Sequence, residues 1–419
     1  MLVMEILNSQ RINMKTLRPY QDELSNEGVI ILLKKKIVIY AMQVRTGKTA
    51  VALNTAKLYG AKNVLFLTKK KAISSIEEDF VDFRFNKSFN ITVANNESLH
   101  KVVGDFDLVV MDESHRFGSY PKPSKGAKDF KLRFSRLPII LLSGTLTPES
   151  HSQIYHQLWI SSSSPFPEAT FYKWANRYVQ VTQKNLGYGL VNDYSKAIKE
   201  KIDEVVNPYI LTFTQEQAGF STEVKETVLF CPMSDTLNDV IRQLKRDLVI
   251  QGKDELIMAD TAVKLMSKLH QLEGGTIKFE SGNSKVLDFS KAIYIKNKFE
   301  GKKLGIFYKF KAELTALKEV YGDDLTTDLE EFNATDKSIA LQFLSGREGI
   351  SLRAAKCLVY YNIDYSATTY FQAKDRLTTM DRLSNDVYYV LAEKGLGSQV
   401  LKQVQAKKNF TLSYFKKLL

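Results

Sequence analysis

Short, nearly continuous apolar runs recur between residues 37 and 142, and the stretches between them are long enough for one helix each. The runs read IVIYAM, NVLFLT, NITVAN, LVVMDE and IILLSG. A strand that is buried on both faces loses the alternation of apolar and polar residues, and such strands belong to parallel sheets covered by helices. The pattern therefore predicts an α/β lobe built on a parallel sheet.

The same pattern returns from about residue 302, where the runs read KKLGIFY, SIALQFL, KCLVYYN and DVYYVLA. This predicts a second α/β lobe. Residues 150 to 300 read as mostly helical: SDTLNDVIRQLKRDL places leucines and an isoleucine on one helical face behind a Ser234/Asp235 cap, and TAVKLMSKLHQLEGG stops at a glycine pair. The expected organisation is a lobe over 1–155, a largely helical insertion over 156–300, and a second lobe over 301–419.

Composition sets broad limits on the class of protein. The chain has 419 residues, 44% of them hydrophobic and 25% charged, as in ordinary soluble proteins with two domains. No apolar run approaches the roughly 18 residues of a membrane span, and no secretion signal is visible, so a cytoplasmic protein is the simplest interpretation. Cys231 and Cys357 lack metal-ligand spacing and are expected in the core. A formal charge of +12 favours a polyanionic partner, although a lysine-rich solvated surface is an equal alternative.

The segment TGKT follows the first apolar run and precedes AVALNTAKLYG, a helix expected to end at Gly60. A phosphate-binding loop needs backbone N–H groups that converge on phosphate oxygens, a lysine, and a hydroxyl for Mg²⁺ at the start of a helix. Gly47, Lys48 and Thr49 supply these groups. GKT is common by chance, and Met42 stands where the first glycine of the usual loop lies, so other motifs have to decide.

The segment LVVMDESH, residues 108 to 115, ends an apolar strand in two acids. In that position Asp112 can hold Mg²⁺, and Glu113 can orient and deprotonate an attacking water. An acidic pair that only caps a turn is the alternative. The loop about 60 residues upstream favours the nucleotide site.

Taken in order, GKT, DESH and LLSGTLTP resemble motifs I, II and III of the superfamily 2 helicases and translocases. LRPYQ, residues 17 to 21, looks like the adenine-reading segment before motif I. FLSGREGISLRAAKCLVYYN resembles motif V, YFQAKDRL resembles motif VI, and NITVANNESLH is similar to a segment of the Swi/Snf-type translocases. The resemblance covers residues 17 to about 395, and the compactness is similar to bacteriophage and prokaryotic members. It implies two tandem RecA-like P-loop NTPase lobes that use ATP and Mg²⁺, and in such loops the first glycine is loosely kept.

The resemblance also implies roles for individual residues of the first lobe. Lys48 would contact the β and γ phosphates, Thr49 and Asp112 would hold Mg²⁺, and Glu113 would be the general base. The other implied contacts of ATP are Gln21, Arg45, Thr46, Gly47 and Ala50. His115 would couple the ATP site to the neighbouring strand, and Ser143 and Thr145 would connect the state of the ATP to the grip on nucleic acid. Gln372 of the second lobe would be a further coupling residue. A satisfied structural histidine and a turn after a strand are the alternatives for His115 and the SGT segment.

Further contacts are implied at the second lobe and at a basic segment of the first. Gly349 of motif V would let backbone approach the nucleotide, and Arg376 and Arg382 would line the ATP cleft. Because Thr379 departs from the motif VI pattern, the arginine that reaches the γ phosphate is not assigned between them. Nucleic-acid phosphates would contact Thr68, Lys69, Lys70, Ser345 and Arg347. Surface salt bridges and solvated lysines are the structural alternatives.

The function that this set of motifs favours is an ATP-dependent DNA translocase or helicase, acting in phage or bacterial replication, recombination or branch migration. Contacts to phosphates carry no base information, so DNA would be bound with little sequence preference. An RNA helicase and a nucleotide-gated nucleic-acid clamp with little hydrolysis are the alternatives. No nuclease, zinc or targeting module is recognised, so a replication or recombination protein is an expected partner.

Overall fold

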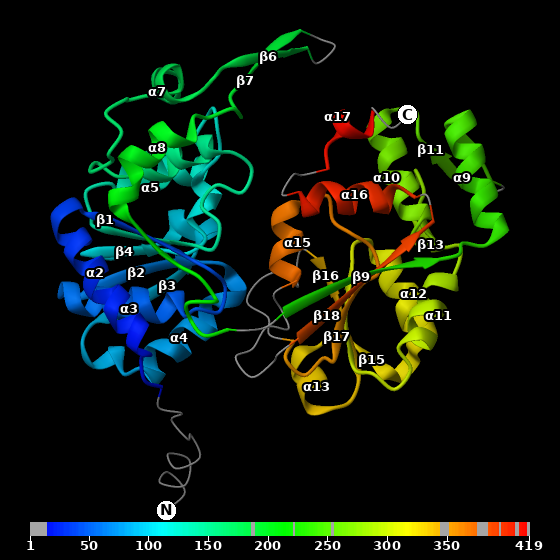
Figure 1. The fold of residues 1–419 in the computed structure, drawn as a ribbon, viewed down its shortest axis with the longest axis horizontal. Helices are drawn as coiled ribbons and strands as arrows, with labels where there is room; N and C mark the ends of the chain where they lie inside the picture. The colour runs from blue at the N-terminus through cyan, green and yellow to red at the C-terminus, as the bar shows by residue number, and fades with distance from the viewer. Residues whose placement is uncertain are drawn as a thin grey trace, which may run out of the picture. The chain divides into compact units, whose positions relative to one another are not determined.

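The computed structural model describes residues 15–185, 189–220, 223–252, 255–343, 352–374, 384–393, 395–406 and 410–416. The chain forms two compact units, Met1–Gly219 and Phe220–Leu419 (Figure 1). Each unit is built on a six-stranded sheet in which all neighbouring strands run parallel. The predicted class, α/β with two parallel-sheet lobes of the RecA-like type, is confirmed.

The first sheet has the strand order β3-β2-β4-β5-β1-β8. The five apolar runs of the first lobe form β1 (Ile37–Met42), β2 (Asn63–Thr68), β3 (Asn90–Asn95), β4 (Leu108–Met111) and β5 (Ile139–Ser143), and β8 (Ile210–Phe213) adds the edge beyond β1. Since the strands are parallel, their carboxyl ends lie along one edge of the sheet. The loops that follow β1, β2, β4 and β5, which carry the predicted site residues of this unit, therefore share that edge.

Helices cover both faces of the first sheet. On one face α2 (Pro19–Lys35), α3 (Lys48–Tyr59) and α4 (Ile73–Asp82) pack on residues such as Val38 and Tyr40. On the other, α5 (Lys125–Phe134), α6 (Ile154–Trp159), α7 (Phe171–Tyr178) and α8 (Lys199–Val206) pack on residues such as Ile37 and Ile39. Successive residues of a strand point to opposite faces, so a continuous apolar run is what this layered arrangement requires.

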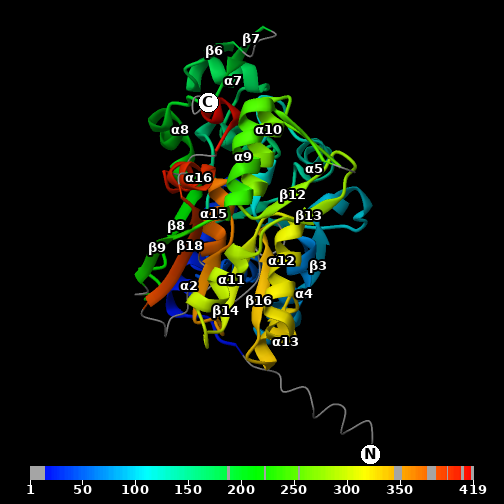
Figure 2. The ribbon, with the colours of Figure 1, turned by 90° about the vertical axis from the view of Figure 1, so that its right-hand side faces the viewer.

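The second sheet has the order β15-β16-β14-β17-β18-β9. Its strands are β9 (Glu223–Cys231), β14 (Leu304–Tyr308), β15 (Leu325–Thr326), β16 (Ser338–Gln342), β17 (Cys357–Tyr360) and β18 (Ser384–Ala392). α11 (Ser290–Lys298) and α12 (Lys311–Tyr321) lie side by side on one face (Figure 2). The other face is covered by α9 (Asp235–Asp247), α10 (Ala262–Leu272), α13 (Leu329–Ala334), α15 (Ala367–Lys374) and α16 (Leu396–Gln405), with α17 (Leu412–Phe415) beyond them.

Residues 156–300, expected as a largely helical insertion, are shared between the two units. The predicted helices are confirmed as α9, whose Ser234 cap accepts from the Leu237 amide, and α10, which is followed by Gly275 at φ +74°. The region also supplies one edge strand to each sheet, β8 and β9. It further contains the hairpins β6–β7 (Thr182–Asn185, Leu190–Asp193), β10–β11 (Val249–Gln251, Leu256–Met258) and β12–β13 (Thr276–Lys278, Ser284–Val286).

Two smaller expectations can also be compared with the structure. Cys231 and Cys357 are both buried and neither forms a disulfide, which confirms their prediction as core residues. Within the described residues, no helix is both long enough and apolar enough to cross a lipid bilayer.

Candidate nucleotide-binding site

The loop between β1 and α3 has the backbone geometry that the sequence predicts. Gly47 is the N-terminal cap of α3 and has φ +83°, and Arg45 also lies in the left-handed region with φ +65°. A Cβ atom at position 47 would lie 1.9 Å from Nε2 of Gln21. Both the backbone angle and the close approach of α2 therefore require glycine at this position.

Side chains from the start of α2 form hydrogen bonds to the backbone of this loop. The Nε2 of Gln21 donates to the Thr46 carbonyl at 3.4 Å, and the Tyr20 hydroxyl donates to the same carbonyl at 3.1 Å. The Oε1 of Gln21 accepts from the Arg18 amide at 2.9 Å. Gln21 is buried with both amide atoms bonded within the unit, so here it supports the loop, and its contact with adenine stays a prediction.

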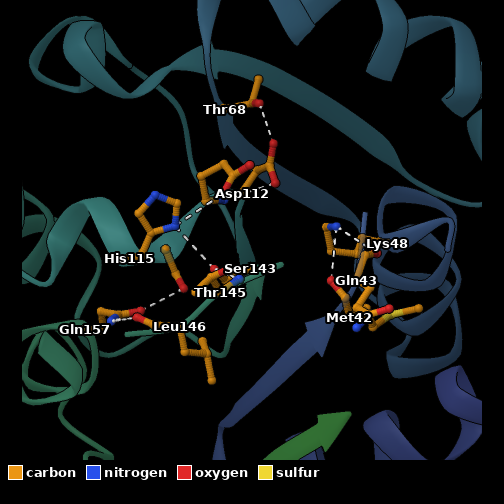
Figure 3. A network of polar contacts seen from close by, with 12 residues as sticks. Met42, Gln43, Lys48, Thr68, Asp112, His115, Ser143, Thr145, Leu146 and Gln157 are labelled. Carbon is orange, nitrogen blue, oxygen red and sulfur yellow. Dashed lines mark hydrogen bonds and ion pairs between the residues drawn. The ribbon is translucent and has the colours of Figure 1, made fainter. Parts of the chain in front are cut away.

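Lys48 folds back over the end of β1. Its Nζ donates to the carbonyls of Met42 and Gln43, each at 3.2 Å (Figure 3). The Met42 side chain is fully buried among the helices of that face while its carbonyl faces the lysine. A methionine is tolerated at this position because only the backbone carbonyl of residue 42 contacts Lys48, whereas the side chain packs in the hydrophobic core.

The acidic pair follows β4 at the same edge of the sheet. Oδ2 of Asp112 accepts from the Thr68 hydroxyl at 2.9 Å, and Oδ1 accepts from the Glu113 amide at 3.0 Å. Glu113 has φ +52°, an uncommon angle for a residue with a side chain, and this turns the chain sharply after the strand. The turn directs the two carboxylates to different partners.

Burial raises the pKa of Asp112 to about 6, and the neighbouring negative charge of Glu113 adds to the rise. Burial also pushes the pKa of Glu113 upward, but the positive charges of His115, Lys69, Lys48 and Arg116 together outweigh it, so that pKa lies below its usual value. The positive charge of Lys48, which follows β1 at the same edge of the sheet, lowers the pKa of both carboxyl groups. Glu113 is thus kept as a carboxylate, the form that a general base requires.

The loops after β4 and β5 are connected by hydrogen bonds. Nδ1 of His115 lies 3.2 Å from Oε2 of Glu113 and 3.2 Å from the Ser143 hydroxyl (Figure 3). That hydroxyl oxygen accepts from the Thr145 amide at 3.1 Å. The three residues of the first unit that carry predicted coupling roles, His115, Ser143 and Thr145, therefore form one contiguous network.

The basic segment after β2 lies next to this network. Thr68 has no exposed surface and its hydroxyl is engaged with Asp112. Lys69 is half-buried and close enough to lower the pKa of both acids, whereas Lys70 is exposed. Thr68 and Lys69 thus belong to the surroundings of the acidic pair, and Lys70 keeps a position open to solvent.

Several predicted residues of the second unit lie outside the described residues: Ser345, Arg347, Gly349, Arg376 and Arg382. Gln372 lies in α15, but its side chain is not among those described. Their roles stay predictions.

The structure adds residues that the motifs did not indicate. Gln215, which follows β8, donates from its backbone amide to Gln43 at 2.7 Å and from its side-chain amide to the Val44 carbonyl at 3.0 Å. Gln157 of α6 contacts Ser114 and Leu146. Neither glutamine has a local sequence signal, because each meets its partner only through the tertiary fold.

The first unit fits ATP with Mg²⁺ by the chemistry of its donors. The amides at the start of α3 and the Lys48 ammonium suit phosphate oxygens, and the absence of a Cβ at Gly47 leaves room for Gln21 to support the loop. No group of three or more His, Cys, Asp or Glu side chains is gathered for a metal within the described part of the chain. Asp112 with the Thr49 hydroxyl matches Mg²⁺, which binds through one or two protein oxygens and takes other ligands from phosphates and water.

Replacing Gly47 with alanine should raise the KM for ATP by about 10- to 100-fold, because the new Cβ forces the loop and Gln21 apart and displaces the phosphate contacts. Gly60, at the other end of α3, is the matched control: it has the same φ of +83° but nothing within 4 Å of a Cβ. Both alanine variants bear the backbone cost of about 1–2 kcal/mol. Equal KM values for Gly47→Ala and Gly60→Ala would contradict the role of the close contact.

The proteins to which this chain is similar include the following two, and no family model matches the sequence. The replication restart protein PriA of Helicobacter pylori is 25% identical over 179 residues, which are 41% of this chain and 26% of that protein. The matched segment thus spans about a quarter of that relative's length. The Sulfolobus solfataricus SWI2/SNF2 ATPase core, solved in complex with dsDNA, aligns over 97% of this chain and 94% of that chain at 14% identity, with a TM-score of 0.42.

Proposed function

We propose that this protein is a nucleic-acid-stimulated ATPase of superfamily 2, acting as a DNA translocase or helicase of the Swi/Snf-like group. The observation that carries the proposal is the placement of Lys48, which follows β1, and of Asp112 and Glu113, which follow β4, at the carboxyl edge of one parallel sheet. A lysine at a helix N-terminus beside a buried acidic pair is the arrangement that hydrolysis of a nucleoside triphosphate requires.

Each residue of the site has a distinct task in this mechanism. Lys48 and the amides at the start of α3 bind the β and γ phosphates, with Arg45, Thr46 and Ala50 shaping the loop. Thr49 and Asp112 would hold Mg²⁺, which when bound neutralises charge on the phosphates. Glu113 accepts the proton of the attacking water. Gln21 keeps the loop in place against α2 and is the proposed contact of the adenine.

Coupling to nucleic acid is proposed to pass through the loop after β5. His115 is shared between Glu113 and Ser143, so a change at the general base alters the histidine's bond to Ser143 and hence the loop that carries Thr145. Gln372, Arg376, Arg382 and Gly349 are the proposed contributors of the second unit. Motif VI is proposed to supply a charge-stabilising arginine, chosen between Arg376 and Arg382.

DNA is the proposed polymer, and its phosphates are proposed to contact Lys70, Ser345 and Arg347, with Thr68 and Lys69 at the end of the basic segment that lies beside the acidic pair. The net charge of +12 supports a polyanionic ligand. The name of the similar PriA protein refers to replication restart, which agrees with a role in bacterial or phage replication, recombination or branch migration. Residues 156–300 or a partner protein would set the particular task.

The test is the steady-state ATPase rate of the full chain without nucleic acid and with single-stranded DNA, duplex DNA, branched DNA and RNA, with Glu113→Gln as the inactive control. We expect DNA to stimulate the ATPase rate of the wild type and not that of the variant. The ratio of the rates with duplex and with single-stranded DNA identifies the form of DNA on which the protein acts. Stimulation by RNA alone would favour an RNA helicase. A low ATPase rate that is the same in all five conditions would contradict the proposed translocase or helicase function. The nucleotide-gated nucleic-acid clamp would then be the remaining alternative.

A further inference from the structure

We propose that Gln157 is a positioning residue that ties the loop carrying Glu113 to the loop carrying Thr145, so that the two loops move together. The proposal rests on the ATPase function above. It concerns a side chain that lies in α6, outside every motif that the sequence identifies.

The contacts of Gln157 reach both loops. Its Oε1 accepts from the Ser114 hydroxyl at 2.9 Å, and its Nε2 donates to the Leu146 carbonyl at 2.7 Å (Figure 3). The same Nε2 donates to the Gln153 carbonyl one helical turn earlier, at 3.0 Å. Ser114 directly follows the proposed general base, and Leu146 directly follows Thr145. One amide group therefore bridges the two chain segments whose coupling the mechanism needs.

The direction of this bridge is set by the chemistry of its partners. Two carbonyl oxygens face one end of the amide, and a carbonyl can only accept, so that end must be the NH₂ group. The Oε1 end therefore faces Ser114, whose hydroxyl must donate. Gln157 and Ser114 are each only 1% exposed, so water cannot replace a lost bond without cost. A buried bridge with a single allowed orientation transmits displacement of one loop to the other.

The Gln157 bridge differs in kind from the histidine link between the same loops. Nδ1 of His115 lies 3.2 Å both from Glu113 and from Ser143, and whether it donates or accepts there depends on the protonation state and tautomer of the ring. The amide of Gln157 has no titratable group and a separate donor for each carbonyl. The Gln157 bridge therefore connects the loops in the same way in every protonation state of His115.

The test replaces Gln157 with methionine, which keeps the length of the side chain and removes both hydrogen-bonding ends. With duplex or single-stranded DNA present, we expect kcat to fall by about 3- to 30-fold, while KM for ATP and the rate without DNA change less than about twofold. In hydrogen exchange without ATP, amides of the loop over residues 143–148 should exchange faster. This second readout does not depend on ATP turnover.

Two further variants make the outcome decisive. Gln153→Met is the matched control, because Gln153 is a buried glutamine of the same segment whose side-chain oxygen accepts from the Glu149 and Ser150 amides and not from the Ser114 hydroxyl. Ser114→Ala breaks the same bridge from its other end with little change in volume. The Ser114→Ala/Gln157→Met pair should therefore be no slower than the slower single variant.

A loss of thermal stability in Gln157→Met with unchanged stimulated kcat and unchanged exchange would overturn the proposal, as would an equal loss of kcat in Gln153→Met. If Gln157→Met does not fold, Ser114→Ala alone tests the proposal through the DNA-stimulated kcat and the hydrogen exchange of residues 143–148. A wild-type chain without ATPase activity would instead overturn the proposed function. The exchange comparison would still report whether Gln157 connects the loops.

Discussion

Glu113→Gln should lower the DNA-stimulated ATPase rate by about 10²- to 10⁴-fold, the range over which a general base contributes to catalysis. Glutamine has the same shape but cannot accept the proton of the attacking water. ATP binding should persist, because removal of the negative charge at position 113 lowers the pKa of Asp112 and leaves the proposed metal ligand ionised. The measurement is kcat for hydrolysis beside the affinity for a fluorescent ATP analogue.

Glu77→Gln provides the matched control for this substitution, since Glu77 is an exposed residue of α4 and should retain the full rate. A Glu113→Gln variant that hydrolyses ATP at more than a tenth of the wild-type rate would show that another group activates the water. Loss of ATP binding together with turnover would instead assign Glu113 to nucleotide binding.

Lys48→Ala should reduce kcat/KM for ATP by about 10²- to 10³-fold, because it removes a preorganised positive charge from the place where phosphate charge develops. The lysine also bonds the carbonyls of Met42 and Gln43, so its loss frees the loop from the end of β1. Binding and turnover should therefore both weaken, unlike the result for Glu113→Gln. Isothermal titration with ATP and Mg²⁺ measures the effect on ATP affinity, and the steady-state rate measures the effect on turnover.

Lys57→Ala is the control for Lys48→Ala, because Lys57 lies exposed in the last turn of the same helix α3. Its ATPase parameters should match the wild type. An unchanged ATP affinity in Lys48→Ala would remove Lys48 from the phosphate site and, with it, the observation on which the proposed function depends.

The local parts of this protein could be predicted from its sequence because their signals are local. A continuous apolar run predicts a strand buried on both faces, and each of the predicted runs became a strand of one of the two sheets. Gly47 after a strand and before a helix, and the acidic pair after β4, follow from residue types at short spacing. The caps at Ser234 and Gly60 are equally local.

The middle of the chain shows where local signals fail. Strands of three or four residues, such as β8 and those of the hairpins, are too short to show the alternation of apolar and polar residues that identifies a strand in a sequence. β9 lies at the edge of its sheet and exposes Val228 and Phe230, so its pattern resembles neither a buried strand nor a clean alternation. Their membership of the two sheets depends on pairing with strands distant in sequence.

The sequence by itself therefore determined the elements, their class and the residue types of the site, since these depend on neighbours a few positions apart. Only the tertiary structure decided which of those residues meet: Thr68 with Asp112, Gln21 with Thr46, and Gln157 with Ser114, which is 43 positions away. Such contacts depend on the order and register of the strands and on how α2 and α6 pack against them. These are set by the burial of whole faces, which no short stretch of sequence contains.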